Sequence, residues 1–339
     1  MTETVTPTKT IEQYLTSREH ELADASIQNI RYRLKQFRLW TDEVDLKDIS
    51  ELDGMMCERW KLARVEAGLA PITVQQHMRT FRHYVRWMGT VGYVDPDLHE
   101  LIRIPSVDKS ERSRDEMIEF ERSEAIMEYL GQFAWASRRH VVFGVLWHTA
   151  MRTGSLRALD VDDVEEHGDV VYLRVRHRPE TETPLKLRGD GSRNVTISDG
   201  DLGNAILDYV DHTRPDVEDE YERSPLIATK NGRASKTTIR VDCYRATHPC
   251  EIGDCPHDKN KQDCKYRSHG QTGGCPSARS PHAVRRGAIT AHLNRGIEKE
   301  VIGERAAVSV STLESHYDAR TEEAKRRNRL LALGELVND

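Results

Sequence analysis

Four residues in the second half of the chain have side chains that could act together on a phosphate group: Arg152, His282, Arg285 and Tyr317. His282 and Arg285 are three residues apart, so they share one face of a helix that Pro281 would open. The guanidinium groups of Arg152 and Arg285 are permanently charged donors for the charge that develops on phosphate oxygens during attack. A phenol with a pKa of about 10 becomes a useful nucleophile where a base or cations stabilise its anion, and His282 with the two arginines could do this for Tyr317.

A lysine could complete this set by supplying a proton. Residues 183–198, TPLKLRGDGSRNVTIS, place Lys186 ahead of a Gly-Asp-Gly turn and a returning strand, so the pattern predicts a β-hairpin. Lys186 could protonate the 5′ oxygen that leaves a cleaved phosphodiester, so that it departs as a hydroxyl. Arg188 and Arg193 are nearby cations, and solubility of the hairpin would also account for all three. The sequence has no Gly-rich phosphate-binding loop, and this chemistry requires neither ATP nor a catalytic metal.

The segments that carry these residues resemble the active-site motifs of one family. Residues 148–164, HTAMRTGSLRALDVDDV, are similar to T-G-[LM]-R-x-x-E-x-x-x-L-x-x-x-D, and the matching positions are Thr149, Met151, Arg152, Leu159 and Asp163. Residues 280–296, SPHAVRRGAITAHLNRG, contain an H-x-x-R box, and residues 302–327, IGERAAVSVSTLESHYDARTEEAKRR, place a Tyr after an Ile-Gly turn. The chain therefore resembles the tyrosine recombinases, or phage integrases.

The sequence departs from the family pattern at three positions. Ala150 replaces the usual Gly, and Ser155 stands where the family has an acidic residue, so the Arg must be oriented differently. The His or Trp that the family places ahead of the nucleophile is missing. Arg305 is the candidate replacement, with Glu304 as the alternative.

The resemblance implies a catalytic set, a reaction and partners. The implied catalytic residues are Arg152, Lys186, His282, Arg285, Arg305 and Tyr317. Tyr317 would cleave DNA through a 3′-phosphotyrosyl bond and rejoin it, and so integrate, excise or resolve mobile DNA. Two domains would clamp double-stranded DNA, and a homo-tetramer would assemble on paired sites with the amphipathic tail at 322–336 packed on a neighbour. A DNA-binding protein on the same scaffold that no longer cuts is the main alternative, and a relaxing topoisomerase is the second.

The elements that must position these residues are mostly helices. Apolar residues recur at helical spacing in residues 11–22, 26–41, 55–66 and 72–88, and this predicts a helical first domain. The fourth of these helices mixes hydrogen-bond donors and cations around its apolar positions, which suggests phosphate or groove contact as an alternative to a solvated face. The candidate DNA-contacting residues are Arg33, Gln75, Gln76, Arg79, Arg82 and Arg86.

A polar segment with Pro105, residues 104–119, marks the boundary between two domains. We predict a SAM-like helical core-binding domain at 1–107, a linker at 108–118 and a catalytic domain at 119–339 that ends in a helix. Helical periodicity returns at 125–133 and 141–151, and period-two alternation at 170–175 and 194–197 predicts a small antiparallel sheet. The expected fold class is therefore mainly α with a small antiparallel β-sheet, with an α+β catalytic domain.

A cysteine cluster lies directly before the predicted H-x-x-R helix, in a Cys-rich insertion at 243–279. Its members are Cys250, Cys255, Cys264 and Cys275, with three histidines interspersed. In a reducing compartment four thiolates this close favour a structural zinc over disulfides. Free thiols are the alternative, and a His could replace one Cys as a ligand. Cys57 and Cys243 have the setting of core residues.

Length and composition agree with this organisation. A chain of 339 residues is long enough for about two domains. The net charge of -6 argues against a uniformly basic nucleic-acid binder, but 37 Arg against 13 Lys favours clustered bidentate phosphate contacts. The start MTETVTPTKT lacks the features of a secretory signal, and no apolar run is long enough for a membrane span. We therefore expect a cytoplasmic protein with no membrane partner.

Overall fold

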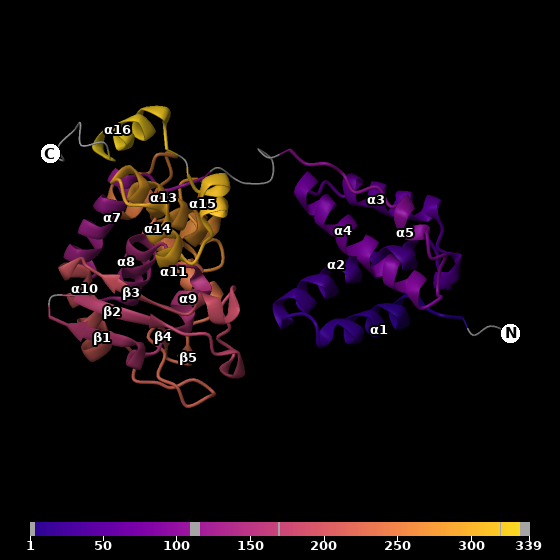
Figure 1. Ribbon diagram of the computed structural model, residues 1–339, viewed down its shortest axis with the longest axis horizontal. Helices are drawn as coiled ribbons and strands as arrows, with labels where there is room; N and C mark the ends of the chain where they lie inside the picture. The colour runs from indigo at the N-terminus through magenta and orange to yellow at the C-terminus, as the bar shows by residue number, and fades with distance from the viewer. Residues whose placement is uncertain (1–3, 109–115, 169, 319, 333–339) are drawn as a thin grey trace. The chain divides into compact units, whose positions relative to one another are not determined.

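A computed structural model describes residues 4–108, 116–168, 170–318 and 320–332. The chain divides into two compact units, an N-terminal unit at 1–115 and a C-terminal unit at 116–339 (Figure 1). This division falls within the predicted linker at 108–118, of which 109–115 lie outside the described residues. Ile118 does not belong to a linker: its side chain is buried in the core of the C-terminal unit, and its N–H donates to the carbonyl of Ala283.

The N-terminal unit is a bundle of helices around an aromatic core. Its helices are α1 (Pro7–Glu19), α2 (Asp24–Glu43), α3 (Gly54–Glu66), α4 (Pro71–Thr90) and the short α5 (Leu98–Leu101). The four predicted helices are all present, and Pro7 and Pro71 lie in the first turns of α1 and α4, where a missing N–H costs nothing. Phe37 packs against Phe81 with ring centroids 4.6 Å apart and against Trp60 at 5.5 Å, which joins α2, α3 and α4.

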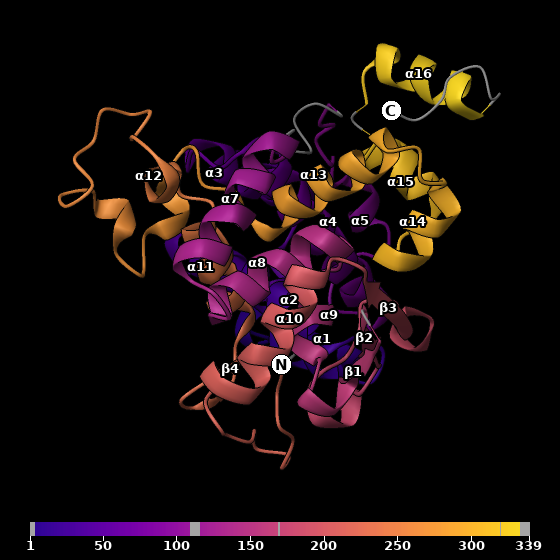
Figure 2. The same ribbon diagram turned by 90° about the vertical axis from the view of Figure 1, so that its left-hand side faces the viewer.

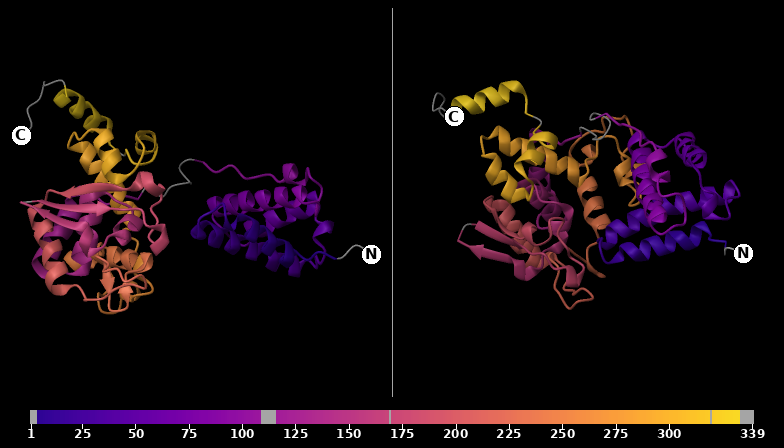
Figure 3. Two further views of the ribbon diagram at one scale, coloured as in Figure 1. Left: turned by 60° about the horizontal axis from the view of Figure 1, so that its bottom comes forward. Right: turned by 45° about the vertical axis from the view of Figure 1, so that its right-hand side comes forward.

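The C-terminal unit is built around α8, which is buried along nearly its whole length. Figure 2 shows α8 among other helices of the unit, and Figure 3 gives two further views of the chain. The helices of this unit are α7 (Phe120–Phe133), α8 (Arg138–Thr149), α9 (Thr153–Ala158), α10 (Gly200–Asp208), α11 (Lys236–Ala246), α12 (Pro249–Ile252), α13 (Pro281–Asn294), α14 (Lys299–Ala306), α15 (Val310–His316) and α16 (Glu322–Ala332). Gly144 lets α10 approach α8, because a Cβ there would lie 2.4 Å from Cδ1 of Leu202. None of the helices in the described parts of the chain is long and apolar enough to cross a membrane.

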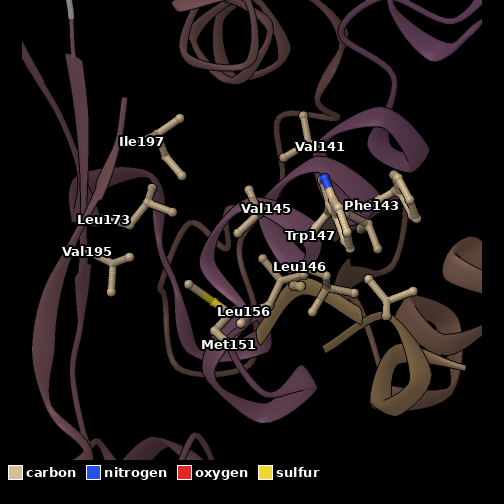
Figure 4. Close-up of a cluster of buried hydrophobic side chains, with 14 of the residues drawn as sticks. Val141, Phe143, Val145, Leu146, Trp147, Met151, Leu156, Leu173, Val195 and Ile197 are labelled. Carbon is tan, nitrogen blue, oxygen red and sulfur yellow. The ribbon is translucent and has the colours of Figure 1, made fainter. Parts of the chain in front are cut away.

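One face of α8 is covered by a three-stranded antiparallel sheet of β1 (Val164–His167), β2 (Val170–Val175) and β3 (Arg193–Ile197), in the order β1-β2-β3. The register pairs Leu173 with Val195. Leu173, Val195 and Ile197 point from the sheet toward Val145 and Met151, as Figure 4 shows. β2 and β3 are the two predicted strands, whereas β1 has too few apolar residues for the sequence pattern to reveal it. A two-stranded ribbon, β4 (Ala228–Thr229) with β5 (Gly232–Arg233), lies elsewhere in the unit.

A network of ion pairs fixes the turn that leads from α9 into β1. The carboxylate of Asp160 accepts hydrogen bonds from Arg223 at 2.7 Å and from Arg233 at 2.5 Å. Asp163, which the sequence motif singles out, accepts two hydrogen bonds from Arg178, each 2.8 Å long. Bidentate pairs with little solvent around them hold geometry well, so this network keeps the end of α9 in place. The network therefore also limits movement at the other end of α9, where Arg152 lies.

Candidate active site

Arg152 lies at the start of α9, directly after a tight left-handed turn. α8 ends at Thr149, and Ala150 takes a left-handed backbone with φ of 51° and ψ of 23°. This is the position where the resembling family has Gly, and a residue with a Cβ is strained there. The turn reverses the chain, so that Arg152 reaches Ala307 and its Nη1 donates to that carbonyl at 2.6 Å.

α13 presents His282 and Arg285 from its first turns. The Ser280 hydroxyl accepts a hydrogen bond from the Ala283 N–H at 3.2 Å, so Ser280 is the predicted N-cap. The side chain of Arg285 is only 2% exposed, and its Nη1 donates to the carbonyls of Ala150 at 2.5 Å and Ala306 at 2.8 Å. Arg285 thereby ties the end of α8 to the end of α14.

Tyr317 lies at the end of α15, against both of these side chains. The guanidinium carbon of Arg285 is 5.2 Å from the centroid of the Tyr317 ring, and the His282 ring centroid is 5.6 Å from it. The Tyr317 carbonyl accepts a hydrogen bond from the Thr290 hydroxyl at 3.1 Å, which fixes the end of α15 against α13. Three separate segments of the chain therefore bring Arg152, His282, Arg285 and Tyr317 into one site.

The arginines of this site lack acidic partners. None of Arg152, Arg193 and Arg285, nor the neighbouring Arg305, forms an ion pair with a carboxylate among the residues that the structure describes. Backbone carbonyl oxygens accept hydrogen bonds from Arg152 and Arg285 instead. Among the described residues, Nε and Nη2 of Arg285 have no hydrogen-bond partner. Burial and the charge of Arg152 lower the pKa of Arg285 to about 10, while Tyr317 acts in the opposite direction. Cations without acidic partners and with unused donors have the chemistry to bind an anion.

Arg193 belongs to this cluster, although the sequence indicated only a nearby cation. Burial lowers its pKa to about 10, and the charges of Arg285, Arg152 and Arg305 act in the same direction. Its Nε donates to the carbonyl of Arg305 at 2.8 Å. The signal was present in the sequence: along β3, Arg193 shares the inward face with Val195 and Ile197, because side chains alternate between the faces of a strand.

Lys186 lies in the connection between β2 and β3 and is exposed. Leu185 beside it is buried and donates from its N–H to Nδ1 of His177 at 2.9 Å, so the segment is anchored directly before Lys186. Burial is the largest cause that lowers the pKa of His282, followed by the charge of Arg285 and then by further cations that include Lys186. Lys186 is therefore close enough to the site to act on it electrostatically.

The guanidinium of Arg305 points toward a different part of the unit. Its Nη2 donates to the carbonyl of His148 at 3.2 Å, and Nε2 of His292 approaches the same carbonyl at 3.1 Å. No contact of Arg305 with Tyr317 or His282 is found among the described residues. Its side chain supports the end of α8, and its carbonyl supports Arg193.

Ser155 lies where the resembling family has a carboxylate, and it is buried. With no acidic side chain at this position, the carbonyls at Ala150, Ala306 and Ala307 orient the two arginines. Ala307, like Ala150, has a left-handed backbone, with φ of 50°. Ala150 and Ala307, the two left-handed residues, each supply one of these carbonyls.

The predicted DNA-contacting residues of the N-terminal unit divide into two groups. Gln76, Arg79 and Arg86 are exposed at helical spacing along α4, and Arg82 is half-buried. Arg33 donates from α2 to the Thr80 hydroxyl at 3.0 Å and to Oε1 of Gln76 at 2.9 Å, so it is partly engaged within the protein. Gln75 is not on this surface: it is 3% exposed, and its Nε2 donates to the Pro105 carbonyl at 2.7 Å. Gln75 is thus a structural residue, contrary to the prediction.

The four clustered cysteines are free thiols in this structure, and all four line one pocket together with His248 and His257. As they are placed, no three His, Cys, Asp or Glu side chains in the described ranges are arranged to hold a metal ion. Cys57 and Cys243 are buried in the two cores, as their settings indicated.

Comparisons with known proteins agree with this architecture. No protein-family model matches the sequence, and no curated protein sequence matches it. The structure of the Tn1549 transposon integrase with a circular intermediate DNA is similar at a TM-score of 0.66 and 13% identity, over 97% of this chain and 100% of that one. A lambda integrase dimer bound to a COC′ core site is similar at a TM-score of 0.64 and 10% identity, over 93% of this chain and 77% of that one.

A third structure covers a smaller part of the chain. It is the N-terminal domain of a phage integrase/site-specific recombinase from Haloarcula marismortui, with 32% identity and a TM-score of 0.29, over 30% of this chain and 97% of that one. The two nearly full-length likenesses show the architecture, because each spans both units. The chain has the fold of the tyrosine recombinases, in which a helical core-binding part precedes a catalytic part with a small antiparallel sheet.

Proposed function

We propose that this chain is a site-specific DNA recombinase that cleaves and rejoins DNA strands through a 3′-phosphotyrosyl intermediate on Tyr317. The observation that carries the proposal is the position of the Tyr317 ring against His282 and Arg285, within a cluster of arginines that have no acidic partners among the described residues. A site that only bound DNA would need the cations but would not need a phenol against them. The fold supports the same reading.

The chemical step follows from the groups in the site. The Tyr317 oxygen attacks phosphorus and forms a new P–O bond while the bond from phosphorus to the 5′ oxygen breaks. His282 accepts the phenol proton, since its lowered pKa keeps the imidazole neutral near pH 7. Arg152 and the free Nε and Nη2 of Arg285 bind the non-bridging oxygens, on which negative charge develops. Lys186 gives a proton to the leaving 5′ oxygen, which departs as a hydroxyl.

Rejoining reverses this step with a 5′ hydroxyl from the same or another strand. The phosphotyrosyl bond keeps the energy of the cleaved bond, so ligation requires no ATP. Arg193, held among the same cations, adds positive charge behind the phosphate. Arg305 acts in this scheme through Arg193, because the carbonyl of Arg305 accepts a hydrogen bond from Nε of Arg193. The Arg305 guanidinium would support the site in place of the family's missing His.

The proposed substrate is double-stranded DNA, with the N-terminal unit contacting it through the exposed side of α4. Gln76, Arg79 and Arg86 form a row on that side, with Arg82 half-buried next to them. Exchange of strands between two sites requires paired protomers, and we propose a homo-tetramer in which the tail beginning at α16 packs on a neighbour. The lambda integrase structure contains a dimer on a core site, which is half of such an assembly. Integration, excision and resolution of mobile DNA would all use this chemistry.

A nicked suicide substrate tests the proposal directly. Cleavage next to the nick releases a short fragment, so the covalent complex of protein and DNA is trapped and runs as a shifted band after denaturation. We expect the native chain to form this adduct on DNA that flanks its own gene, and Tyr317→Phe to abolish it without loss of DNA binding. Binding with no adduct would favour the non-cleaving alternative. Relaxation of supercoiled plasmid that needs no particular site would favour a topoisomerase.

A further inference from the structure

Within the C-terminal unit, the chain between α11 and α13 makes an excursion that begins and ends at the same point. The Thr247 hydroxyl accepts a hydrogen bond from the Arg279 N–H at 2.8 Å and donates to the Arg279 carbonyl at 3.2 Å, although the two residues are 32 positions apart. Arg122 of α7 donates to the carbonyls of Thr247 and Ser277 and so clamps both ends. Residues 248–278 therefore form a closed lobe, which Figure 2 shows around α12 as loops with little regular structure.

This lobe has almost no hydrophobic core. Its regular elements are the four-residue α12 and two 3₁₀ turns, Lys265–Arg267 and Thr272–Gly274. Within residues 248–278, all of which the structure describes, the buried apolar side chains are Cys250 and Ala278. Segments shorter than about 40 residues rarely hold a fixed structure by apolar burial alone, and metals or disulfides usually make up the difference.

Instead of a hydrophobic core, the lobe has a pocket lined by cysteine side chains. Cys250, Cys255, Cys264 and Cys275 all line one pocket with a volume of 190 Å³, and none of them forms a disulfide. The Arg267 guanidinium donates toward the Cys250 sulfur at 3.7 Å.

The two histidines of the pocket are engaged with other partners. Nε2 of His248 lies 3.0 Å from the Thr272 carbonyl, and Nε2 of His257 lies 2.9 Å from the Ser277 hydroxyl. One ring nitrogen of each histidine is thus engaged, whereas none of the four thiols forms a disulfide.

We propose that Cys250, Cys255, Cys264 and Cys275 bind one zinc ion through four thiolates. Four sulfur ligands close the tetrahedral coordination of Zn²⁺ and leave no position for a substrate, so the site is structural. In the described parts of the chain no three of these side chains are arranged to hold a metal ion, and binding would draw the thiols inward across the pocket with release of the thiol protons.

The zinc would act on the site of Tyr317 through the start of α13. Arg279 is hydrogen-bonded to Thr247 at the base of the lobe, and Ser280, the N-cap of α13, is the next residue. Two residues later comes His282, whose ring lies against Tyr317. A lobe held by metal fixes this entry to α13, whereas a loose lobe would let the first turn of the helix fray.

The first experiment is metal analysis of the full-length chain purified without added zinc. We expect one zinc per chain in the native protein, the same in the control Cys57→Ser, whose thiol is buried in the N-terminal unit, and loss of zinc in Cys264→Ser and Cys275→Ser. His257→Asn should keep its zinc. A native chain that holds no zinc and keeps four reactive thiols would overturn the proposal, and so would full zinc in Cys264→Ser.

Two further measurements do not depend on the folding of a cysteine variant. Replacement of the metal by Co²⁺ in the native chain should give the thiolate-to-cobalt absorption and the strong visible bands of a tetrahedral sulfur site, and their absence would refute it. Chelation should open residues 248–278 to limited proteolysis, while the N-terminal unit stays resistant. A cleavage pattern that chelation leaves unchanged would show that the metal does not hold the lobe.

Discussion

Replacing Arg285 by Lys separates charge from geometry at the centre of the proposed site. The native guanidinium uses Nη1 for two carbonyls, those of Ala150 and Ala306, and keeps Nε and Nη2 without a protein partner. A lysine ammonium retains the positive charge but is a single point with three donors on a flexible stem. It cannot hold both carbonyls and also present two directed donors to a phosphate.

The size of the effect follows from what is lost. Removal of one preorganised donor to a developing oxyanion typically slows a reaction by about 10²–10³-fold, or about 2.7–4 kcal/mol. Loss of one hydrogen bond from a charged group should lower the free energy of unfolding by about 1.5–3 kcal/mol. Affinity for DNA should change little, because the charge is kept. Arg285→Lys should therefore cleave about 10²–10³-fold more slowly while it still binds and folds.

The assay is the single-turnover rate of adduct formation on the nicked substrate, with the protein in excess and at saturating concentration. Arg295→Lys is a matched control, since Arg295 is exposed at the end of the same helix α13 and should leave the rate within about twofold. Thermal unfolding and a DNA-binding titration check that both variants are intact. A folded Arg285→Lys protein that forms the adduct within about tenfold of the native rate would refute the reasoning, because the directed donors would then be dispensable.

Three other outcomes are expected. Ala150→Gly should change the free energy of unfolding in urea by less than about 1 kcal/mol, because relief of the left-handed strain offsets the greater freedom of the unfolded chain. The β-branched Ala150→Val should lower the free energy of unfolding by more than about 2 kcal/mol. Equal values for the two variants would contradict this. Burial lowers the pKa of His148 and of His292 to about 4. In the unfolded chain the pKa of these histidines is about 6.5, so their full contribution to stability is present above that pH. The free energy of unfolding should fall by about 2 kcal/mol per histidine from pH 7 to pH 5. Equal urea midpoints at the two pH values would argue against it. Arg79→Ala and Arg86→Ala should each weaken DNA binding and reduce the slope of log affinity against log salt by about 0.9, as measured by fluorescence anisotropy, and unchanged slopes would exclude both residues from the contact.

Local physical chemistry determined much of this protein. Apolar residues at helical spacing placed all four main helices of the N-terminal unit, and Ser280 with Pro281 placed the start of α13, because caps and periodicity act between near neighbours. Alternation placed β2 and β3. The motifs also carried four side chains that the fold brings together, Arg152, His282, Arg285 and Tyr317, because spacing within a helix and the order of motifs are properties of the sequence.

Tertiary packing decided the rest, since it joins residues that are distant in sequence. Gln75 has the polar composition of a binding face, but its side chain is buried against Pro105, 30 positions away. Arg305 reaches the carbonyl of His148, and Arg193 instead enters the cluster around Arg285. Which of two cations points toward a site depends on how α14 and β3 pack against α8. The sequence named the groups that could act on a phosphate, and only the folded chain decided which of them face Tyr317.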